Sequence, residues 1–418
     1  MSKLTKYAFS KLYEINSGIS TTKAQAGHGS PFISFSTIFN NIYLPEKIDE
    51  LMNTSEKEQE TYSVKKGDIF LTRTSETIDE LAMSCVALKD YPQTTFSGFA
   101  KRLRPLQTDI TYDKFMAFYL RSSFFRRVIT NHTNMTLRAS FNEDIFSYIY
   151  LYLPEYKEQV KIGDFLFELE EKRRINNRII ELLKLKISKQ FTFWFLNYKF
   201  PYGEFNHYVS DGGKMALKKG SRRKIPEIFD NIALSTLTTI KGDKINPSDY
   251  TDVVFKHYSI PAYDKYGTYL EEKGETIKSE KYVVTNTDIL VSKLNPRFSR
   301  VILPEDSEHT ISSTEFVVWE TKNVYVRNFL YALSINEDFI NYCIANATGT
   351  SNSHKRIDPD IMMDYKISAN DDYIELYGKS VEADIEQINM LMLENRKIEC
   401  TINYTLPLFV NGQIKFSK

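Results

Sequence analysis

The chain has 418 residues, of which 42% are hydrophobic and 14% aromatic, and its 54 Lys and Arg residues balance its 54 Asp and Glu residues. This length predicts two or more globular domains, and this composition excludes an intrinsically disordered chain. The zero formal charge is evidence against a protein that binds nucleic acid by electrostatics alone. The three cysteines are odd in number and scattered, which indicates neither a disulfide framework nor a metal site.

The N-terminal residues lack the apolar region of a signal peptide. No apolar run approaches the roughly 18 residues that a membrane span needs. Together with the scattered cysteines, these features predict a cytoplasmic protein with no membrane partner.

Positive charge is concentrated in two stretches. Eight basic residues lie between Lys101 and Arg138 against Asp109 and Asp113, and the stretch from Lys214 to Lys224 has six basic residues and no acid. A neutral total therefore allows a basic face, although each of these charges is equally consistent with an ordinary solvated surface.

A segment of twelve residues occurs twice, about 220 residues apart. Residues 62–73 read YSVKKGDIFLTR and residues 282–293 read YVVTNTDILVSK, with Tyr, Val, Asp and Ile identical. Each copy precedes a predicted amphipathic helix, at Phe115–Val128 and at Phe329–Ile344. A long helix follows in each half, over residues 155–198 and 371–404. Solenoid repeats have periods of about 20–50 residues, so this period indicates a duplicated domain plus helix.

The two long helices carry apolar seams with a 3.5-residue period, which is typical of a coiled coil. Each seam contains an asparagine, which we interpret as a register-setting residue; an imperfect seam with an exposed asparagine is the alternative. Pro407 is expected to end the second helix early. The seam residues are Leu166, Leu169, Asn176, Ile180, Leu183 and Ile187 in the first helix and Ile385, Ile388, Met392, Asn395 and Ile402 in the second.

Connectivity predicts how the seams pair. The first helix leads away from the first domain and the second helix begins at the second domain, so seams that bury each other run antiparallel. The predicted fold class is α+β, with two globular domains separated by a pair of long antiparallel coiled-coil helices and an internal pseudo-twofold repeat. The predicted segments are 1–153 (first domain), 154–200 (first helix), 201–224 (basic linker), 225–369 (second domain) and 370–410 (second helix).

No catalytic constellation is found. The chain has no phosphate-binding loop, no dinucleotide fingerprint and no nucleophile elbow, and its six histidines never fall at metal-ligand spacing. Asn295-Pro-Arg-Phe298 superficially resembles the Asn-Pro-Pro-Tyr/Phe motif of amino-group methyltransferases. It lacks the second proline, and the chain lacks a glycine-rich cofactor loop. We therefore expect no catalytic residue, metal or cofactor site in this chain.

Polar loops occur at matched points of the two copies, after the repeated segment and before the long helix. Short polar side chains mixed with Arg, Lys, Asn and His can hydrogen-bond both phosphates and base edges, although such residues also mark ordinary loops. Arg73 and Lys293 could instead pair with a nearby carboxylate. The candidate DNA-binding residues are Arg73, Thr74, Ser75, Asn134, Thr136 and Arg138 in the first domain and Lys293, Asn295, Arg297, Ser353, His354, Lys355 and Arg356 in the second.

The whole chain resembles a specificity (S) subunit of a type I restriction-modification enzyme, in which target-recognition domains alternate with conserved long helices. The likeness is carried by LPEYKEQVKI at 153–162, DILVSKLNP at 288–296, STEF at 313–316 and FSGF at 96–99. The start of the second long helix, ANDDYI at 369–374, departs from the pattern of the first.

The resemblance implies that each domain reads one half of a split, asymmetric duplex site through the major groove, while the helices set the unread spacer. It also implies two modification subunits on the helices, which bind S-adenosylmethionine and methylate adenine, and restriction/translocase subunits that use ATP and Mg. This chain would be their non-catalytic specificity subunit. Two alternatives stay open, a coiled-coil adaptor that does not bind DNA and part of a fused adenine methyltransferase.

Overall fold

The computed structural model describes residues 3–75, 80–132, 139–203, 206–221, 223–305, 307–349 and 354–416. The chain divides into two compact units. Unit 1 is Met1–Lys172 with Cys400–Lys418, and unit 2 is Arg173–Glu399. The long helices α7 (Tyr156–Phe191) and α13 (Glu382–Val410) each contribute residues to both units. None of the helices among the described residues is both long and apolar enough to cross a membrane.

Each unit contains a four-stranded antiparallel sheet, and the two sheets have the same topology. The strand order is β2-β9-β5-β7 in unit 1 and β17-β25-β22-β23 in unit 2. The central strands β5 and β22 are the two copies of the repeated sequence, and both are buried along their whole length. The strands are β2 Tyr13–Ser17, β5 Ile69–Thr72, β7 Ser84–Val86 and β9 Ala100–Pro105 in unit 1, and β17 Thr238–Ile240, β22 Asp288–Ser292, β23 Val301–Ile302 and β25 Phe316–Thr321 in unit 2.

Smaller sheets complete unit 1. A three-stranded sheet has the order β4-β3-β8, and two-stranded ladders join β1 to β11 and β6 to β10. Phe70 of β5 and Phe96 of β8 pack with ring centroids 5.2 Å apart, so the core joins the two larger sheets. The strands are β1 Thr5–Ala8, β3 Ala26–Ile33, β4 Leu51–Met52, β6 Thr74–Ser75, β8 Thr95–Phe96, β10 Ala139–Ser140 and β11 Tyr150–Leu153, and the short helices are α1 Phe9–Leu12, α2 Phe35–Asn40, α3 Glu56–Thr61 and α6 Glu143–Tyr148.

Unit 2 has the corresponding parts. A five-stranded sheet has the order β18-β21-β24-β19-β20, and β16 pairs with β26 just before a long helix, as β1 pairs with β11 in unit 1. Two short hairpin ladders, β12-β13 and β14-β15, lie in the linker. The strands are β12 Pro201–Tyr202, β13 Asn206–His207, β14 Met215–Ala216, β15 Ile225–Pro226, β16 Asp230–Ala233, β18 Lys244–Ile245, β19 Val254–Tyr258, β20 Leu270–Lys273, β21 Lys281–Val283, β24 Thr310–Ser312 and β26 Lys366–Ala369, and the short helices are α8 Ile260–Tyr266 and α11 Pro359–Met363.

The single amphipathic helix predicted in each half is a pair of helices. Unit 1 has α4 (Asp113–Tyr119) and α5 (Ser123–His132), and unit 2 has α9 (Val324–Ser334) and α10 (Glu337–Asn346). A polar side chain caps the second helix of each pair, because Ser122 Oγ accepts from Phe125 N at 3.3 Å and Asn336 Oδ1 accepts from Asp338 N at 3.1 Å. These caps start a new helix within an apolar pattern that continues across the break.

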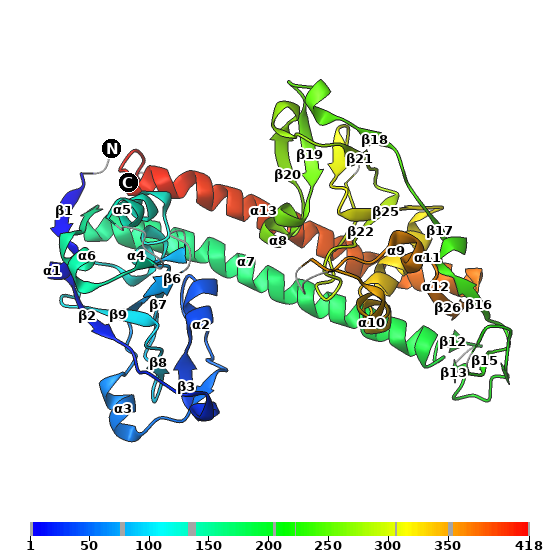
Figure 1. The fold of residues 1–418 in the computed structure, drawn as a ribbon, viewed down its shortest axis with the longest axis horizontal. Coiled ribbons are helices and arrows are strands. Elements are labelled where there is room, and N and C mark those ends of the chain that lie inside the picture. Colours follow the sequence, from blue (N-terminus) through cyan, green and yellow to red (C-terminus); the bar gives the residue numbers. More distant parts are fainter. Residues whose placement is uncertain are drawn as a thin grey trace. The chain divides into compact units, whose positions relative to one another are not determined.

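The first long helix was predicted well and the second less so. α7 is one continuous helix (Figure 1). It spans 36 residues, and a π-helical turn at Thr192–Leu196 follows it. The second is interrupted at Val381, which separates α12 (Asp371–Ser380) from α13. The expectation that Pro407 ends this helix was wrong, since α13 continues to Val410 and Asn411 N donates to Pro407 O at 3.0 Å. A proline in the last turn removes one hydrogen bond without preventing the following ones.

A glycine in each half lets the long helix approach the first helix of the pair. On α7, a Cβ at Gly163 would lie 2.6 Å from Phe115 N, which belongs to α4. On α12, a Cβ at Gly378 would lie 2.0 Å from Tyr325 O, which belongs to α9. Real Cβ atoms do not come so close to backbone, so any other residue here would push the helices apart. The duplication therefore extends to the packing of the helices in each unit.

Candidate nucleic-acid interface

The aspartate shared by the repeated segments is a buried structural residue in both units. Asp68 and Asp288 are fully buried, and each carboxylate accepts from the backbone nitrogen three residues earlier, at Lys65 and Thr285, at 2.8 Å. Each also pairs with a cation, Asp68 with Arg104 at 2.6 Å and Asp288 with Lys241 at 3.1 Å. The carboxylate thus holds the turn that begins the central strand.

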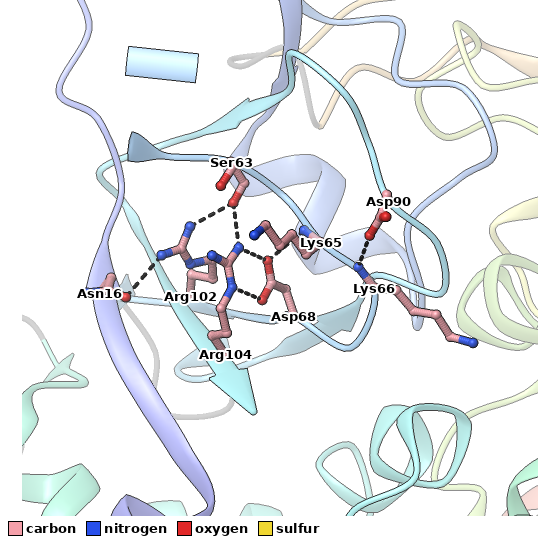
Figure 2. A network of polar contacts seen from close by, with 8 residues as sticks. All are labelled: Asn16, Ser63, Lys65, Lys66, Asp68, Asp90, Arg102 and Arg104. Carbon is pink, nitrogen blue, oxygen red and sulfur yellow. Dashed lines mark hydrogen bonds and ion pairs between the residues drawn. The ribbon is translucent and has the colours of Figure 1, made fainter. Parts of the chain in front are cut away.

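Figure 2 shows this arrangement in unit 1. Arg104 makes two hydrogen bonds to Asp68, and both Arg102 and Arg104 donate to Ser63 O, at 2.7 and 2.8 Å. Arg102 also donates to Asn16 Oδ1 at 3.0 Å. Burial lowers the pKa of Arg102. The hydrogen bonds that Arg104 makes to Asp68 raise the pKa of Arg104. Both guanidinium groups therefore stabilise the sheet from within.

Other basic residues of the 101–138 stretch also act inside the fold. Lys101 Nζ donates to Ser17 Oγ at 2.9 Å, and Lys114 pairs with Asp164 at 2.8 Å. Arg121 donates to four backbone carbonyl oxygens, and its burial lowers its pKa to about 10. Most of the basic residues of this stretch that the structure describes are therefore held by contacts within the fold.

Arg73 and Lys293 occupy equivalent places where the central strands end. Arg73 N donates to Phe99 O at 2.8 Å, and Lys293 N donates to Glu315 O at 3.1 Å. The backbone oxygens of these two residues also have equivalent partners. Phe141 N donates to Arg73 O at 2.8 Å, and Ile357 N donates to Lys293 O at 3.0 Å. Arg73 and Lys293 thus lie at equivalent points of the two sheets, within the same set of backbone hydrogen bonds. We call this set of hydrogen bonds the matched frame.

A matched turn lies beside each of these residues. Phe99 N donates to Ser97 Oγ at 3.2 Å, and Glu315 N donates to Ser313 Oγ at 3.3 Å. The chain then enters β9 or β25. The residue at the third position of the turn differs, Phe99 with 66% of its surface exposed in unit 1 and Glu315 in unit 2. Neither was among the candidate DNA-binding residues, although both lie in the segments FSGF (96–99) and STEF (313–316), which carry the family resemblance.

In unit 2 the structure brings the two candidate loops together. Asn295, with φ of 47°, donates from its backbone nitrogen to Lys355 O at 2.7 Å, and it opens a turn closed by Phe298 N at 3.0 Å. Arg297 lies exposed in that turn, and His354 and Arg356 are exposed in the facing segment. Ser353 lies outside the described residues.

Arg356 is held by a carboxylate rather than standing alone. Its Nε and Nη2 donate to the two oxygens of Glu315 at 3.0 and 3.1 Å. These hydrogen bonds raise the pKa of Arg356. The charge of this candidate phosphate contact is therefore partly compensated, and Glu315 fixes the direction of the guanidinium plane.

In unit 1 the segment that follows the central strand likewise pairs with a segment that precedes the long helix. Thr74 and Ser75 form β6 and pair with Ser140 and Ala139 of β10. Arg73 is exposed, and its Nη1 donates to Gly98 O at 3.4 Å. The remaining candidates of this unit, Asn134, Thr136 and Arg138, lie outside the described residues.

The seam asparagines lie in unit 2, and they contact each other. Asn176 is 4% exposed and Asn395 is 7% exposed, and Asn176 Nδ2 donates to Asn395 Oδ1 at 3.0 Å. Asn176 also donates to Glu394 at 2.8 Å, and Asn395 donates to Asn177 at 2.8 Å. Within unit 2, Ile180, Ile187, Ile385 and Ile388 are buried while Leu183 and Met392 are half-buried, and within unit 1, Leu166 and Ile402 are buried while Leu169 is half-buried.

The helices run antiparallel within unit 2, because Asn176 meets Asn395 while the later residue Lys186 pairs with the earlier Asp384 at 2.8 Å. Replacing Asn395 by Leu should lower the free energy of unfolding by about 1–3 kcal/mol, since it leaves the buried amide of Asn176 short of a partner. Chemical denaturation of the full chain measures this. The double variant Asn176→Leu/Asn395→Leu is the control and should recover most of the loss; equal losses would mean that the asparagines do not act as a pair.

Comparison with known proteins shows a family match for the first part of the chain. Residues 5–185 match the family model described as "Type I restriction modification DNA specificity domain". No curated protein matches the sequence significantly. Among solved structures, the type I restriction-modification S subunit from M. genitalium matches with a TM-score of 0.57 and 13% identity, covering 98% of this chain and 96% of that one.

Two further solved structures align over similar lengths. The HsdS subunit from Thermoanaerobacter tengcongensis is 12% identical with a TM-score of 0.34, and a chain from a structure of type I R-M complex assembly and conformational transition is 11% identical with a TM-score of 0.38. Each alignment covers 98% of this chain and 97% of the other. The chain thus shares its fold with the M. genitalium S subunit, and its residues 5–185 are similar to a type I restriction-modification DNA specificity domain.

Proposed function

We propose that units 1 and 2 each read one half of a split, asymmetric duplex site. The supporting observation is the matched frame at the end of each central strand, where identical backbone hydrogen bonds carry different side chains. Arg73 and Phe99 stand in unit 1 where Lys293 and Glu315 stand in unit 2. A shared frame gives both units one way of approaching a duplex, and different side chains give each unit a different base preference.

The proposal includes partners and their cofactors. Two modification subunits dock on α7 and α13, bind S-adenosylmethionine and methylate adenine in each half-site. Restriction/translocase subunits that use ATP and Mg complete the complex. The match of residues 5–185 to a type I restriction-modification DNA specificity domain supports this assignment, because a specificity subunit directs the chemistry of other chains. The residues of this chain contribute recognition and docking.

The residues of unit 2 allow phosphate and base contacts to be separated. Arg297→Ala should weaken binding to the selected duplex by about 1–3 kcal/mol with little change on random duplex, since Arg297 lies exposed in the turn that follows the central strand. Arg356→Ala should weaken both and reduce the salt slope by about one unit. The measurement is the affinity of the full chain for duplexes selected from a random library and for random duplex, at two salt concentrations.

Two variants serve as controls. Lys322→Ala removes the same charge from an exposed position at the far end of β25 and should leave both affinities unchanged. Glu315→Gln keeps Arg356 but weakens its pairing and should raise affinity for random duplex. Wild-type behaviour of both Arg297→Ala and Arg356→Ala would place the binding face elsewhere on unit 2.

The two rival functions make different predictions. A fused adenine methyltransferase would bind S-adenosylmethionine as an isolated chain, which calorimetry measures directly. A coiled-coil adaptor would show no salt-dependent binding to any duplex. Selection of a split duplex site by the chain alone, without S-adenosylmethionine binding, would support recognition by a specificity subunit against both rivals.

A further inference from the structure

We propose that Phe99 is a specificity-determining residue of unit 1, and that its ring contacts the 5-methyl group of a thymine in the half-site read by this unit. The inference rests on the proposed function and deepens it by naming one base and one atom. In unit 2 the equivalent position belongs to Glu315, whose carboxylate pairs with Arg356.

The Phe99 ring is displayed by a rigid turn. Phe99 N donates to Ser97 Oγ, Phe99 O accepts from Arg73 N at 2.8 Å, and Gly98 N donates to Ile19 O at 2.7 Å. Its neighbour Ala100 is fully buried, as is Phe96. The backbone is therefore fixed on both sides, yet 66% of the Phe99 surface is exposed. A large apolar ring held out by a fixed backbone loses little entropy when it is covered by a ligand.

The matched turn in unit 2 shows that this position is free to vary without changing the frame. Glu315 has the same hydrogen bond to the preceding serine and accepts from Lys293 N through its backbone oxygen. Its carboxylate reaches Arg356, one of the candidate DNA-binding residues. The third position of the turn thus lies within side-chain reach of the recognition loop, and its residue differs in chemical class between the two units.

The neighbourhood of Phe99 suits a base edge in the major groove. The exposed guanidinium of Arg73 lies beside the turn and donates to Gly98 O. Arginine binds guanine edges or phosphates, while phenylalanine makes apolar contact with the thymine methyl group. Among the groups that base edges present in the major groove, the thymine methyl group is the apolar one. It is therefore the group that the Phe99 ring can contact while Arg73 binds a neighbouring polar edge or a phosphate.

The test uses the full chain and a duplex that it has selected from a random library. Each thymine of the selected site is replaced in turn by uracil, which removes only the 5-methyl group. For wild type, one replacement should weaken binding about fourfold, which corresponds to burying one methyl-sized group. Phe99→Ala should weaken binding to the thymine duplex by at least that factor and should be insensitive to the same replacement. Phe99→Leu should restore part of the thymine preference.

Leu106→Ala is the matched control, because Leu106 is 56% exposed and lies just beyond the other end of β9. It should bind like wild type and keep the response to uracil. Equal loss by Phe99→Ala on selected and random duplex would overturn the proposal in favour of sequence-independent stacking. Wild-type affinity of Phe99→Ala on both duplexes would also overturn the proposal, because the ring would then contact no base. Failure of wild type to select any duplex would instead refute the proposed function itself.

Discussion

Exchanging residues 1–153 for the matching domain of a relative with another target is expected to change one half of the modified DNA site and to leave the other half intact. The physical reason is that the sheets have separate cores. The cluster around Phe70 and Phe96 contains only unit 1 residues, and the clusters around Trp319 and Tyr258 contain only unit 2 residues. Affinity for the original duplex should fall about 10³-fold or more, since a wrong half-site leaves mainly non-specific binding.

The measurement is a map of methylated adenines in cells that carry the exchanged chain together with the modification subunits proposed for it. The reciprocal exchange of residues 225–369 is the control and should change the opposite half. Simultaneous loss of both halves from a folded, assembled complex would show that the units do not read independently.

Lengthening both long helices by seven residues is expected to lengthen the unread spacer by about three base pairs and to preserve both half-sites. Seven helical residues add about 10 Å, and base pairs are stacked about 3.4 Å apart. The insertions belong after Lys172 in α7 and after Glu399 in α13, because the units divide at these points and the helix contacts within unit 2, such as Asn176 with Asn395 and Lys186 with Asp384, then stay intact. A seven-residue insertion keeps the phase of the seam.

Insertion into α7 alone is the control. It should destabilise the chain, because α7 and α13 would then differ in length between their contacts in unit 1, such as Phe165 with Phe409, and their contacts in unit 2. Mapping of methylated adenines again gives the result. An unchanged spacer together with an altered half-site would refute the role proposed for the helices.

The sequence alone predicted the duplication and the first long helix, because both depend on local patterns. The identical Asp68 and Asp288 recur since each caps its own turn within three residues, and that geometry needs the same side chain twice. The 3.5-residue period of the seams pointed to paired helices and to Asn176 and Asn395 as their polar members, and the structure places these two asparagines in contact.

Local patterns gave no sign of where the helices break. The apolar period continues across Ser122, Asn336 and Val381, and the hydrogen bonds of Ser122 and Asn336 override it in the two helix pairs. Pro407 predicted a helix end that the structure does not have. A proline in the last turn removes only one hydrogen bond, and the packing of α13 in unit 1 offsets this loss of stability.

Only the tertiary structure decided which basic residues are available to a ligand and which turn displays a side chain. Arg102, Arg104 and Arg121 looked like a basic face, yet they donate to groups that lie far from them in the sequence. Phe99 and Glu315 became comparable once the backbone hydrogen bonds of Arg73 and Lys293 were known. Contacts between distant segments set the burial and direction of these side chains, and composition and periodicity carry no information about such contacts.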